Sequence, residues 1–434
     1  MPRRGSTALI AARRTDRPIT TTELEALADS AGYDVADTVI QARDPHPRYE
    51  FGPGKVETIA ERVDGTNADV VICDNDLDPH QAYDLADAIG VEVIDRKRLV
   101  LDIFAERAET KRARLEVELA ERRYDLPRAE AAAKRGETEG RQGFKSAGES
   151  EASQVRAAYR REIKQLQQEL DQVGAQADDR RAERRNAGFD LVALAGYTNA
   201  GKSTLLRRLA DGLSVDDARH DDLADEASVE DRLFETLGTT TRRASLDDRR
   251  VLLTDTVGFI SDLPHWLVTS FETTLAESYQ ADVVCLVADA SDSVDDLERK
   301  VETSLDVITE FRDGPILPVL NKADVAIDID RKRSLFAELV ADARGETHSD
   351  PVVVSALEPT GLDELATTLD DALPDRERVT FDLPNSGETQ SFVSWCYDHG
   401  TVHDVTYGAS VTVDFEARPE VVAQAEGRVA QLDG

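Results

Sequence analysis

The chain is predicted to be a multidomain α/β protein, with a doubly wound sheet preceded by a small α/β domain and a helical hairpin and followed by a small α+β module. Three observations predict this fold. The chain has 434 residues, of which 40% are hydrophobic, so it exceeds one ordinary domain and can bury sizeable cores. Strand-like apolar runs alternate with helix-like segments on both sides of one long helix-like stretch, and a short alternating run follows near the end. We expect the modules 1–100, 101–187, 188–374 and 375–434.

The first module alternates helix-like and strand-like segments. Its clearest runs are Val70–Cys73, Asp78–Ile89 and Val91–Ile94. Thr21–Leu24 resembles a capping box at a helix start. Phe51–Lys55 is rich in glycine and proline like a phosphate loop, but Val56 follows where that loop needs serine or threonine. We interpret Phe51–Lys55 as a turn.

The second module is helix-like and rich in Ala, Glu, Arg and Gln. One apolar face is predicted from positions at spacings of three and four: Val155, Tyr159, Ile163, Leu166, Leu170 and Val173. Leu115 and Leu119 supply candidates for the facing stripe. Arg135–Glu151 is rich in glycine, serine and charge, which is typical of a loop between two helices. A helical hairpin is therefore expected.

The charge of this hairpin differs from that of the rest of the chain. Residues 101–187 carry 19 Lys+Arg and 18 Asp+Glu, a net charge of +1, which leaves 33 minus 69, or −36, for the remainder. A solvated structural linker and an RNA-contacting element fit the hairpin equally well. Its retained basic residues favour RNA contact, because phosphates require Lys and Arg for neutralisation.

The third module opens with a phosphate-binding loop. Asp190–Ala195 is predicted to be a buried strand and Ser203–Leu209 the start of a helix. The residues between match G-x-x-x-x-G-K-[ST]: Gly196, Tyr197, Thr198, Asn199, Ala200, Gly201, Lys202 and Ser203. The glycines let backbone amides converge on phosphate oxygens, the lysine supplies a cation for the β- and γ-phosphates, and the serine hydroxyl can coordinate Mg²⁺.

A second motif follows the apolar run Val251–Thr254. It consists of Asp255, Thr256, Val257 and Gly258. Its aspartate lies at the carboxyl end of a strand, where open α/β sheets bind ligands. Asp255 can hold Mg²⁺ through water, and the Gly258 amide can sense the γ-phosphate.

A third motif follows Ile316–Leu320 and selects the base. It consists of Asn321, Lys322, Ala323 and Asp324. The two oxygens of Asp324 match the N1 and N2 donors of guanine, a pair that adenine lacks. Asn321 can brace the loop, and Lys322 can lie along the ring. A further strand leads into a short loop that can contact the base: Ser355, Ala356 and Leu357.

Phe259 occupies the position where many GTPases carry the glutamine that orients the attacking water. Phenylalanine cannot orient water by hydrogen bonding, so we expect slow intrinsic hydrolysis. The missing donor would come from a partner, from an ion or from switch I, the loop of GTPases that closes on the γ-phosphate. The alternative is that Phe259 is an apolar plug, which is compatible with the same slow turnover.

The segments between these motifs resemble the HflX family of GTPases. In the third module they are Phe234–Leu237, Thr239–Arg242, Gly258–Pro264 and Phe271–Glu277. Earlier in the chain they are Phe51–Val56, Asp74–Gln81, Val93–Arg96 and Leu101–Arg107. The resemblance covers nearly the whole chain.

The resemblance implies a switch I at Phe234, Glu235, Thr236, Leu237 and Gly238. Thr236 takes the position that coordinates Mg²⁺, with Thr240 and Thr241 as alternatives. From the residues alone, this threonine-rich segment could also be a solvated turn with no role in metal binding. The catalytic roles then go to Lys202, Thr236 and Gly258, and the metal contacts to Ser203, Thr236 and Asp255. The resemblance also implies binding to the large ribosomal subunit through the hairpin. The family's Gly-Pro-Gly-Glu-Thr tip is replaced here by Ala147–Ser150, so the family's tip contacts do not carry over to this chain residue by residue.

Composition argues against disulfide-linked, metal-binding cysteine, membrane and secreted proteins. Cys73, Cys285 and Cys396 fit no metal or disulfide spacing and are typical of core residues in a reducing compartment. No apolar run approaches the roughly 18 residues of a membrane span, and no signal peptide is seen, so we expect a cytoplasmic protein. The net charge of −35 favours a high-salt cytoplasm, where repulsion is screened.

Two further stretches complete the chain. Asp211–Asp231 is strongly acidic and is typical of a solvated insertion. The last module combines three runs: Thr380–Leu383, Thr389–His399 and Ala409–Phe415. The nucleotide-binding motifs predict a Mg²⁺-dependent GTPase, which we expect to be monomeric when free. The resemblance implies that it associates with ribosomes and splits or rescues them. The alternative is an RNA-binding or assembly protein that uses guanine nucleotide only as a conformational ligand; ATP-dependent RNA remodelling by the first module is less favoured, because that module has no second phosphate loop.

Overall fold

The computed structural model describes residues 5–15, 19–108, 110–139, 151–212, 241–246, 249–255, 258–260, 281–311, 314–344 and 350–432. The chain separates into two compact units, one formed mainly by residues up to Gln172 and the other mainly by residues from Val173 onward. The α/β fold class is confirmed, while the boundaries near residues 100, 187 and 374 stay a prediction.

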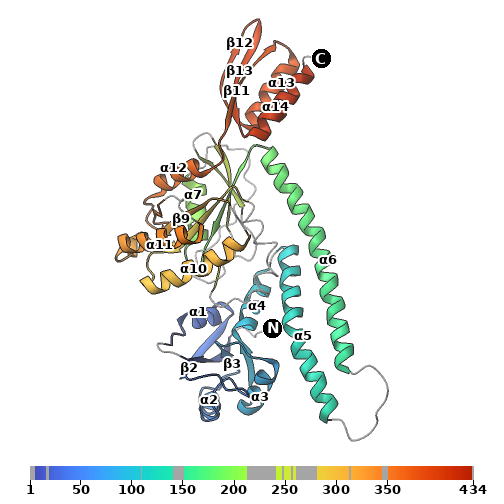
Figure 1. Cartoon of the computed structure of the whole chain (residues 1–434), viewed down its shortest axis with the longest axis vertical. Helices are drawn as coiled ribbons and strands as arrows, with labels where there is room; N and C mark the ends of the chain where they lie inside the picture. The colour runs from blue at the N-terminus through green and yellow to red at the C-terminus, as the bar shows by residue number, and fades with distance from the viewer. Residues whose placement is uncertain are drawn as a thin grey trace. The chain divides into compact units, whose positions relative to one another are not determined.

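The first unit begins with a four-stranded parallel sheet of order β2-β1-β3-β4 (Figure 1). Its elements are β1 (Ser6–Arg14), α1 (Thr22–Ser30), β2 (Tyr33–Ala42), α2 (Pro53–Thr66), β3 (Val70–Cys73), α3 (Pro79–Ile89), β4 (Glu92–Asp95) and α4 (Arg96–Arg107). Leu9, Ile59 and Val71 lie in its core. The alternation of helices and strands expected for this module is present.

Two local predictions for the helix starts of this domain were wrong. Thr21 is the N-cap of α1 but makes no side-chain capping bond, because its φ of −116° and ψ of 1° lie outside the extended region that capping residues adopt. Its hydroxyl instead donates to Glu25 at 2.7 Å. A complete capping box forms instead at Asp78 and Gln81, at the start of α3. The stretch Phe51–Lys55 is not only a turn: Gly52 is the N-cap of α2 and Pro53 its first residue, a position where proline's missing N–H costs nothing.

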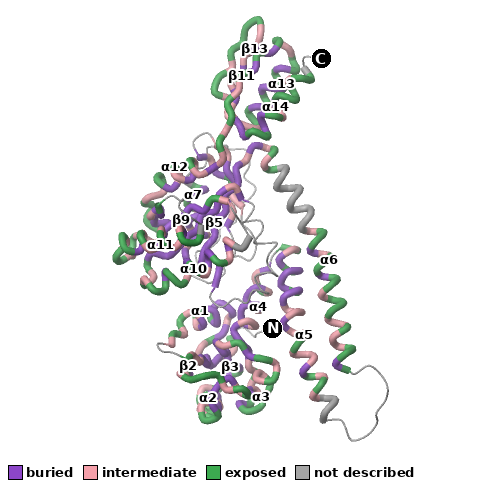
Figure 2. Tube along the Cα trace, viewed as in Figure 1, coloured by how far each residue is buried: buried purple, intermediate pink, exposed green. Residues whose placement is uncertain are grey.

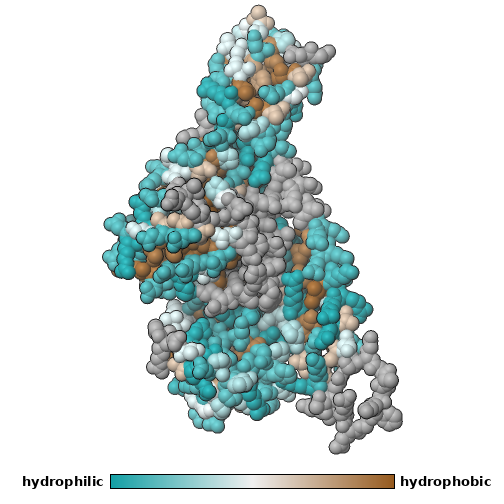
Figure 3. Space-filling model, viewed as in Figure 1, coloured by the Kyte–Doolittle hydropathy of each residue, from teal (hydrophilic) through white to brown (hydrophobic). Residues whose placement is uncertain are grey.

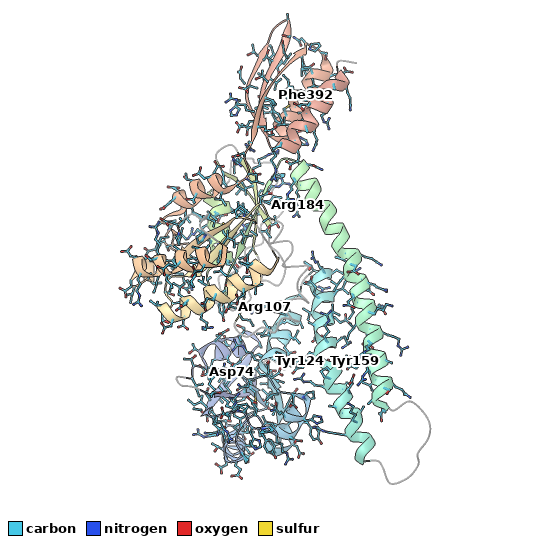
Figure 4. The ribbon with its side chains drawn as sticks, in the orientation of Figure 1. Asp74, Arg107, Tyr124, Tyr159, Arg184 and Phe392 are labelled. Atoms are coloured by element: carbon cyan, nitrogen blue, oxygen red, sulfur yellow. The ribbon has the colours of Figure 1, made fainter. Side chains whose placement is uncertain are left out.

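Two long helices form the hairpin: α5 (Lys111–Glu139) and α6 (Glu151–Asn186). Arg156 bridges Glu130 through two contacts of 2.6 Å each, and Leu119 and Leu166 are buried. Residues 135–139 belong to α5 and Glu151 to α6, so both ends of the predicted loop Arg135–Glu151 were wrong, and its middle lies outside the described residues. Tyr124 on α5, labelled in Figure 4, donates to Asp95 Oδ1 at 2.9 Å and ties this helix to the parallel sheet.

The second unit contains a six-stranded sheet of order β10-β9-β8-β5-β7-β6, in which only β6 is antiparallel. Its elements are β5 (Asp190–Ala195), α7 (Lys202–Gly212), β6 (Thr241–Leu246), β7 (Arg249–Asp255), β8 (Val283–Asp289), α10 (Val294–Phe311), β9 (Ile316–Asn321), the 3₁₀ turn η1 (Ala323–Val325), α11 (Ile329–Arg344), β10 (Val352–Val353) and α12 (Leu362–Ala372). The strands are predominantly buried (Figure 2). Because β5 lies between β7 and β8, the chain order reverses around it, and open α/β sheets bind ligands at the carboxyl ends of the strands at such a reversal.

The C-terminal module is a three-stranded antiparallel sheet of order β11-β13-β12 with two helices on one face (Figure 1). Its elements are β11 (Glu377–Pro384), α13 (Gly387–His399), β12 (Thr401–Tyr407), β13 (Ser410–Ala417) and α14 (Pro419–Leu432). Alternate residues of β13 are buried, among them Val411, Val413 and Phe415, as the alternating sequence predicts.

An arginine after β13 joins this module to the six-stranded sheet. Arg418 Nη1 lies 2.8 Å from Asp190 Oδ1 and 2.6 Å from Asp282 Oδ2. Asp190 begins β5, and Asp282 comes directly before β8. All three side chains are at most 7% exposed. The two modules of the second unit are therefore held together by a buried ion cluster.

The described surface is mostly hydrophilic. On the face displayed in Figure 3, hydrophilic residues predominate over the described part of the chain. Among the described helices, none is both long enough and apolar enough to cross a membrane.

Candidate nucleotide-binding site

The phosphate-binding loop connects β5 to α7 at the carboxyl end of the sheet. Gly196 and Gly201 have φ angles of 141° and 84°, a region that L side chains rarely adopt. A Cβ on Gly196 would lie 2.1 Å from the Val287 carbonyl oxygen, and one on Gly201 would lie 2.4 Å from Asn321 Nδ2. Both positions therefore require glycine for conformation and for space.

Lys202 is folded back against its own loop. Its ammonium donates to the carbonyl oxygens of Gly196 at 3.0 Å and Tyr197 at 2.8 Å, and the residue is 6% exposed. Burial lowers the pKa of Lys202 to about 8, and the nearby Asp255 carboxylate partly offsets this effect. A phosphate group placed in the loop would supply the counter-charge that the buried ammonium needs.

Ser203 and Asp255 bring two oxygen groups together beside this lysine. The Ser203 hydroxyl donates to Asp255 Oδ2 at 2.5 Å, and Asp255, at the end of β7, is 1% exposed. Hydroxyl and carboxylate oxygens are the donors that Mg²⁺ prefers. The chemistry of this pair thus fits a magnesium ion.

The segment after β7 lies directly on the phosphate-binding loop. Phe259 N donates to Gly196 O at 3.1 Å, and Thr198 N donates to Phe259 O at 2.7 Å. A Cβ on Gly258 would lie 2.8 Å from Thr198 and 3.0 Å from Lys202 Nζ, which explains the glycine. The Phe259 ring is buried and has no polar atom, so it acts as an apolar plug here and cannot orient water.

Asn321 braces two loops at once. Its amide nitrogen donates to Ala200 O at 2.9 Å, and its amide oxygen accepts from Ala356 N at 3.1 Å. The residue is 1% exposed. The end of β9 therefore holds the phosphate-binding loop and the loop after β10 in one arrangement.

Asp324 and Lys322 flank the candidate base site. Asp324 Oδ1 accepts from the Ser355 hydroxyl at 2.6 Å, which orients the carboxylate, while Asp324 itself is exposed. Lys322 Nζ lies 2.8 Å from Asp289 Oδ2. Leu357 is 71% exposed, an accessible apolar side chain beside this site. The arrangement offers a carboxylate and an alkyl chain, which suit the edge and the face of a purine.

Sequence reasoning missed Asp289. It follows an apolar run and ends β8, as Asp255 ends β7, so the same strand-end pattern was available to find it. Among the switch I candidates only Thr241 is described; it lies in β6, with its hydroxyl 3.2 Å from that of Thr254. The other predicted positions lie outside the described residues: Phe234, Glu235, Thr236, Leu237, Gly238, Thr240, Thr256 and Val257.

Known families match the chain in three successive parts. Residues 19–105 match the family model described as GTP-binding GTPase N-terminal, and residues 107–184 match the GTP-binding GTPase Middle Region. Residues 191–322 match the model described as 50S ribosome-binding GTPase.

Individual proteins agree with these matches. The chain is 38% identical over 425 residues to the GTPase HflX of Thermococcus kodakarensis, covering 95% of this chain and 91% of that protein. It is 37% identical to the GTPase HflX of Methanocaldococcus jannaschii, over 73% of this chain and 75% of that protein. The crystal structure of the SsGBP and GDP complex shares the fold, with a TM-score of 0.50 at 24% identity, over 84% of this chain and 98% of that one.

Proposed function

Because the chain belongs to the HflX family of GTPases, we propose that it runs a Mg²⁺-dependent GTP cycle on the large ribosomal subunit. The chain is a GTPase, which binds GTP and hydrolyses it to GDP and phosphate. The main observation behind the proposed site is that Lys202, Asp255 and Asn321 come together at the carboxyl ends of the strands of the six-stranded sheet.

The phosphate end of the nucleotide is assigned to the loop from Gly196 to Ser203. Its backbone amides and the N-terminus of α7 would stabilise the negative charge of the phosphates. Lys202 would exchange its two carbonyl partners for phosphate oxygens. Ser203, Asp255 through water, and Thr236 would hold Mg²⁺, which when bound neutralises charge on the β- and γ-phosphates. The Ser203–Asp255 contact of 2.5 Å supports this assignment.

The base is assigned to the carboxylate of Asp324. Asp324→Asn replaces one acceptor oxygen with a donor, so guanine's N2 amine would meet an amide N–H while the C2 carbonyl of xanthine would gain a partner. We expect GDP affinity to fall at least about 100-fold and XDP affinity to rise, measured by equilibrium titration. Asp328→Asn is the matched control, because Asp328 is also exposed and also lies in this loop. Equal losses in the two variants would contradict the assignment.

We propose that GTP hydrolysis needs a water-orienting group that the described residues do not supply. The Gly258 amide would sense the γ-phosphate, but Phe259 supplies no water-orienting group. Phe259→Gln is therefore expected to change phosphate release, either basal or ribosome-stimulated, by several-fold, whereas Phe259→Leu keeps the plug and serves as control. If the glutamine variant matches the native rates under both conditions, the reasoning fails.

Ribosome association is proposed for the whole chain. Two points support it: residues 191–322 match a model described as 50S ribosome-binding GTPase, and the hairpin has a net charge of +1 in a chain of net −35. GTP would order switch I through Thr236, and it would order the segment that follows β7, switch II, through Gly258. Both changes would promote ribosome binding and splitting, and hydrolysis would release the protein.

Sedimentation with purified ribosomes and separated subunits tests this proposal. The experiment compares GDP with a non-hydrolysable GTP analogue in molar KCl, because we propose that the acidic surface is suited to high salt. Co-sedimentation with the large subunit is expected with the GTP analogue and not with GDP. Equal association with both nucleotides would remove the switch from the proposal.

A further inference from the structure

Asp289 lies at the carboxyl end of β8, beside the candidate base site. The strand register pairs it with Asn321, the last residue of β9. Its side chain is 9% exposed, and its Oδ2 lies 2.8 Å from Lys322 Nζ. Its Oδ1 accepts from the backbone N–H of Ser291 at 2.8 Å and from the Ser291 hydroxyl at 2.6 Å. One oxygen therefore fixes the carboxylate, and the other holds the lysine.

The segment that carries Asp289 is itself fixed to the base loop. Ala290 N donates to Asn321 O at 2.8 Å. The buried Lys332, 4% exposed, donates to Ala290 O at 2.7 Å. The carboxylate thus has a defined position relative to the end of β9, which is what an anchoring group requires.

Lys322 is constrained at both ends. Its φ of 64° places the backbone in the left-handed region, and its ammonium is held by Asp289. Its Cε lies 3.9 Å from the Cβ position of Gly201, so the alkyl chain runs next to the end of the phosphate-binding loop. An unanchored lysine samples many rotamers, and ordering it costs free energy at the moment of binding.

We propose that Asp289 is a positioning residue for guanine nucleotide binding. By holding the ammonium of Lys322, it keeps the alkyl chain extended where the face of the base would pack, before the nucleotide arrives. This inference rests on the proposed role of Asn321–Asp324 in base recognition. It adds a residue from a different strand, β8, to the recognition of the base.

A double-mutant cycle in the full-length protein tests the inference, with affinity for a fluorescent GDP as the readout. Asp289→Asn removes the charge and keeps an acceptor for Ser291. It is expected to weaken GDP binding roughly tenfold and to raise KM for GTP similarly, with kcat at saturating GTP unchanged. In a Lys322→Met background the same change is expected to cost less than about twofold, because the anchored group is gone.

Asp292→Asn is the matched control. Asp292 lies three residues away, but its carboxylate contacts Lys300 at 2.6 Å, so GDP affinity is expected to stay within about twofold. Equal losses from Asp289→Asn in the native and Lys322→Met backgrounds would overturn the inference, as would a loss of kcat without a change in KM. If circular dichroism shows Asp289→Asn to be misfolded, Lys322→Met alone decides: unchanged GDP affinity overturns the inference. Failure of the native protein to bind GDP would instead overturn the proposed function.

Discussion

Replacing Arg418 with methionine tests how the C-terminal module is held to the six-stranded sheet. Arg418 is 6% exposed and contacts Asp190, which is fully buried, and Asp282, which is 7% exposed. Methionine keeps much of the side-chain volume and removes the charge. Two buried carboxylates then lose their main partner.

The remaining contacts set the magnitude. Asp190 keeps Arg249 at 3.6 Å and the more remote charge of Arg376, whereas Asp282 keeps the Leu191 N–H at 2.8 Å and Arg185 at 3.2 Å. Breaking a buried ion pair typically costs about 3–5 kcal/mol, and the residual partners favour the lower end, about 3 kcal/mol. For a unit of this size, the unfolding midpoint should fall by about 5–10 °C in differential scanning calorimetry.

The pH dependence has a defined sign. Burial pushes the pKa of Asp282 upward, but the hydrogen bonds from Arg418 and Leu191 together hold it below its usual value. A carboxylate with a lowered folded-state pKa stabilises the protein above its unfolded-state pKa, about 4, and loses that contribution as pH falls through the folded-state value. Arg418 also lowers the pKa of Asp190, which burial raises, so both carboxylates should take up protons at higher pH in the variant than in the native protein. The difference between native and Arg418→Met proteins should therefore be largest near neutral pH and shrink as the pH falls.

Arg428→Met is the control for this experiment. Arg428 also belongs to the C-terminal module, but it stacks over Trp395 with its guanidinium carbon 4.7 Å from the ring centre. Its loss should cost about 1 kcal/mol or less. If Arg418→Met melts within about 2 °C of the native protein at neutral pH, the ion cluster does not hold the modules together.

Two further predictions concern the phosphate-binding loop. Bound phosphate should raise the pKa of Lys202 above its value of about 8 in the free protein. GDP affinity should therefore be constant below pH 8 and fall by up to about tenfold per pH unit above it. Lys202→Arg should abolish this pH dependence, and calorimetry of GDP binding in two buffers should detect proton uptake by the native protein. Flat affinity of the native protein from pH 7 to 10 would contradict this. Gly196→Ala should abolish GDP binding and destabilise the fold by more than about 2 kcal/mol, because the added Cβ meets Val287 O at 2.1 Å and φ is 141°. Gly54→Ala, which meets nothing within 4 Å, should retain native binding and stability, and equal effects of the two glycine variants would refute the steric argument.

The errors of sequence reasoning were local and have physical causes. Thr21–Leu24 resembles a capping box, but the backbone of Thr21, with ψ of 1°, is not extended and so does not aim its hydroxyl at the free N–H groups of α1. The glycine and proline of Phe51–Lys55 are compatible with a turn and with a helix start, and only the continuation into α2 distinguishes them. Arg135–Glu139 has loop-like composition but extends α5, because a helix already nucleated adds residues at little cost.

The sequence by itself determined the fold class, the family and the order of the nucleotide-binding motifs. These depend on short-range patterns: apolar strands, glycines at fixed spacing, and polar residues at strand ends. The tertiary structure decided which side chains support that chemistry. Asp289 meets Lys322 only because β8 and β9 pair in register, and Arg418 meets Asp190 across a separation of 228 residues. A strand-end pattern can mark Asp289 as a candidate, but which residue it contacts is set by packing between strands and modules, as is the pairing of Arg418 with Asp190.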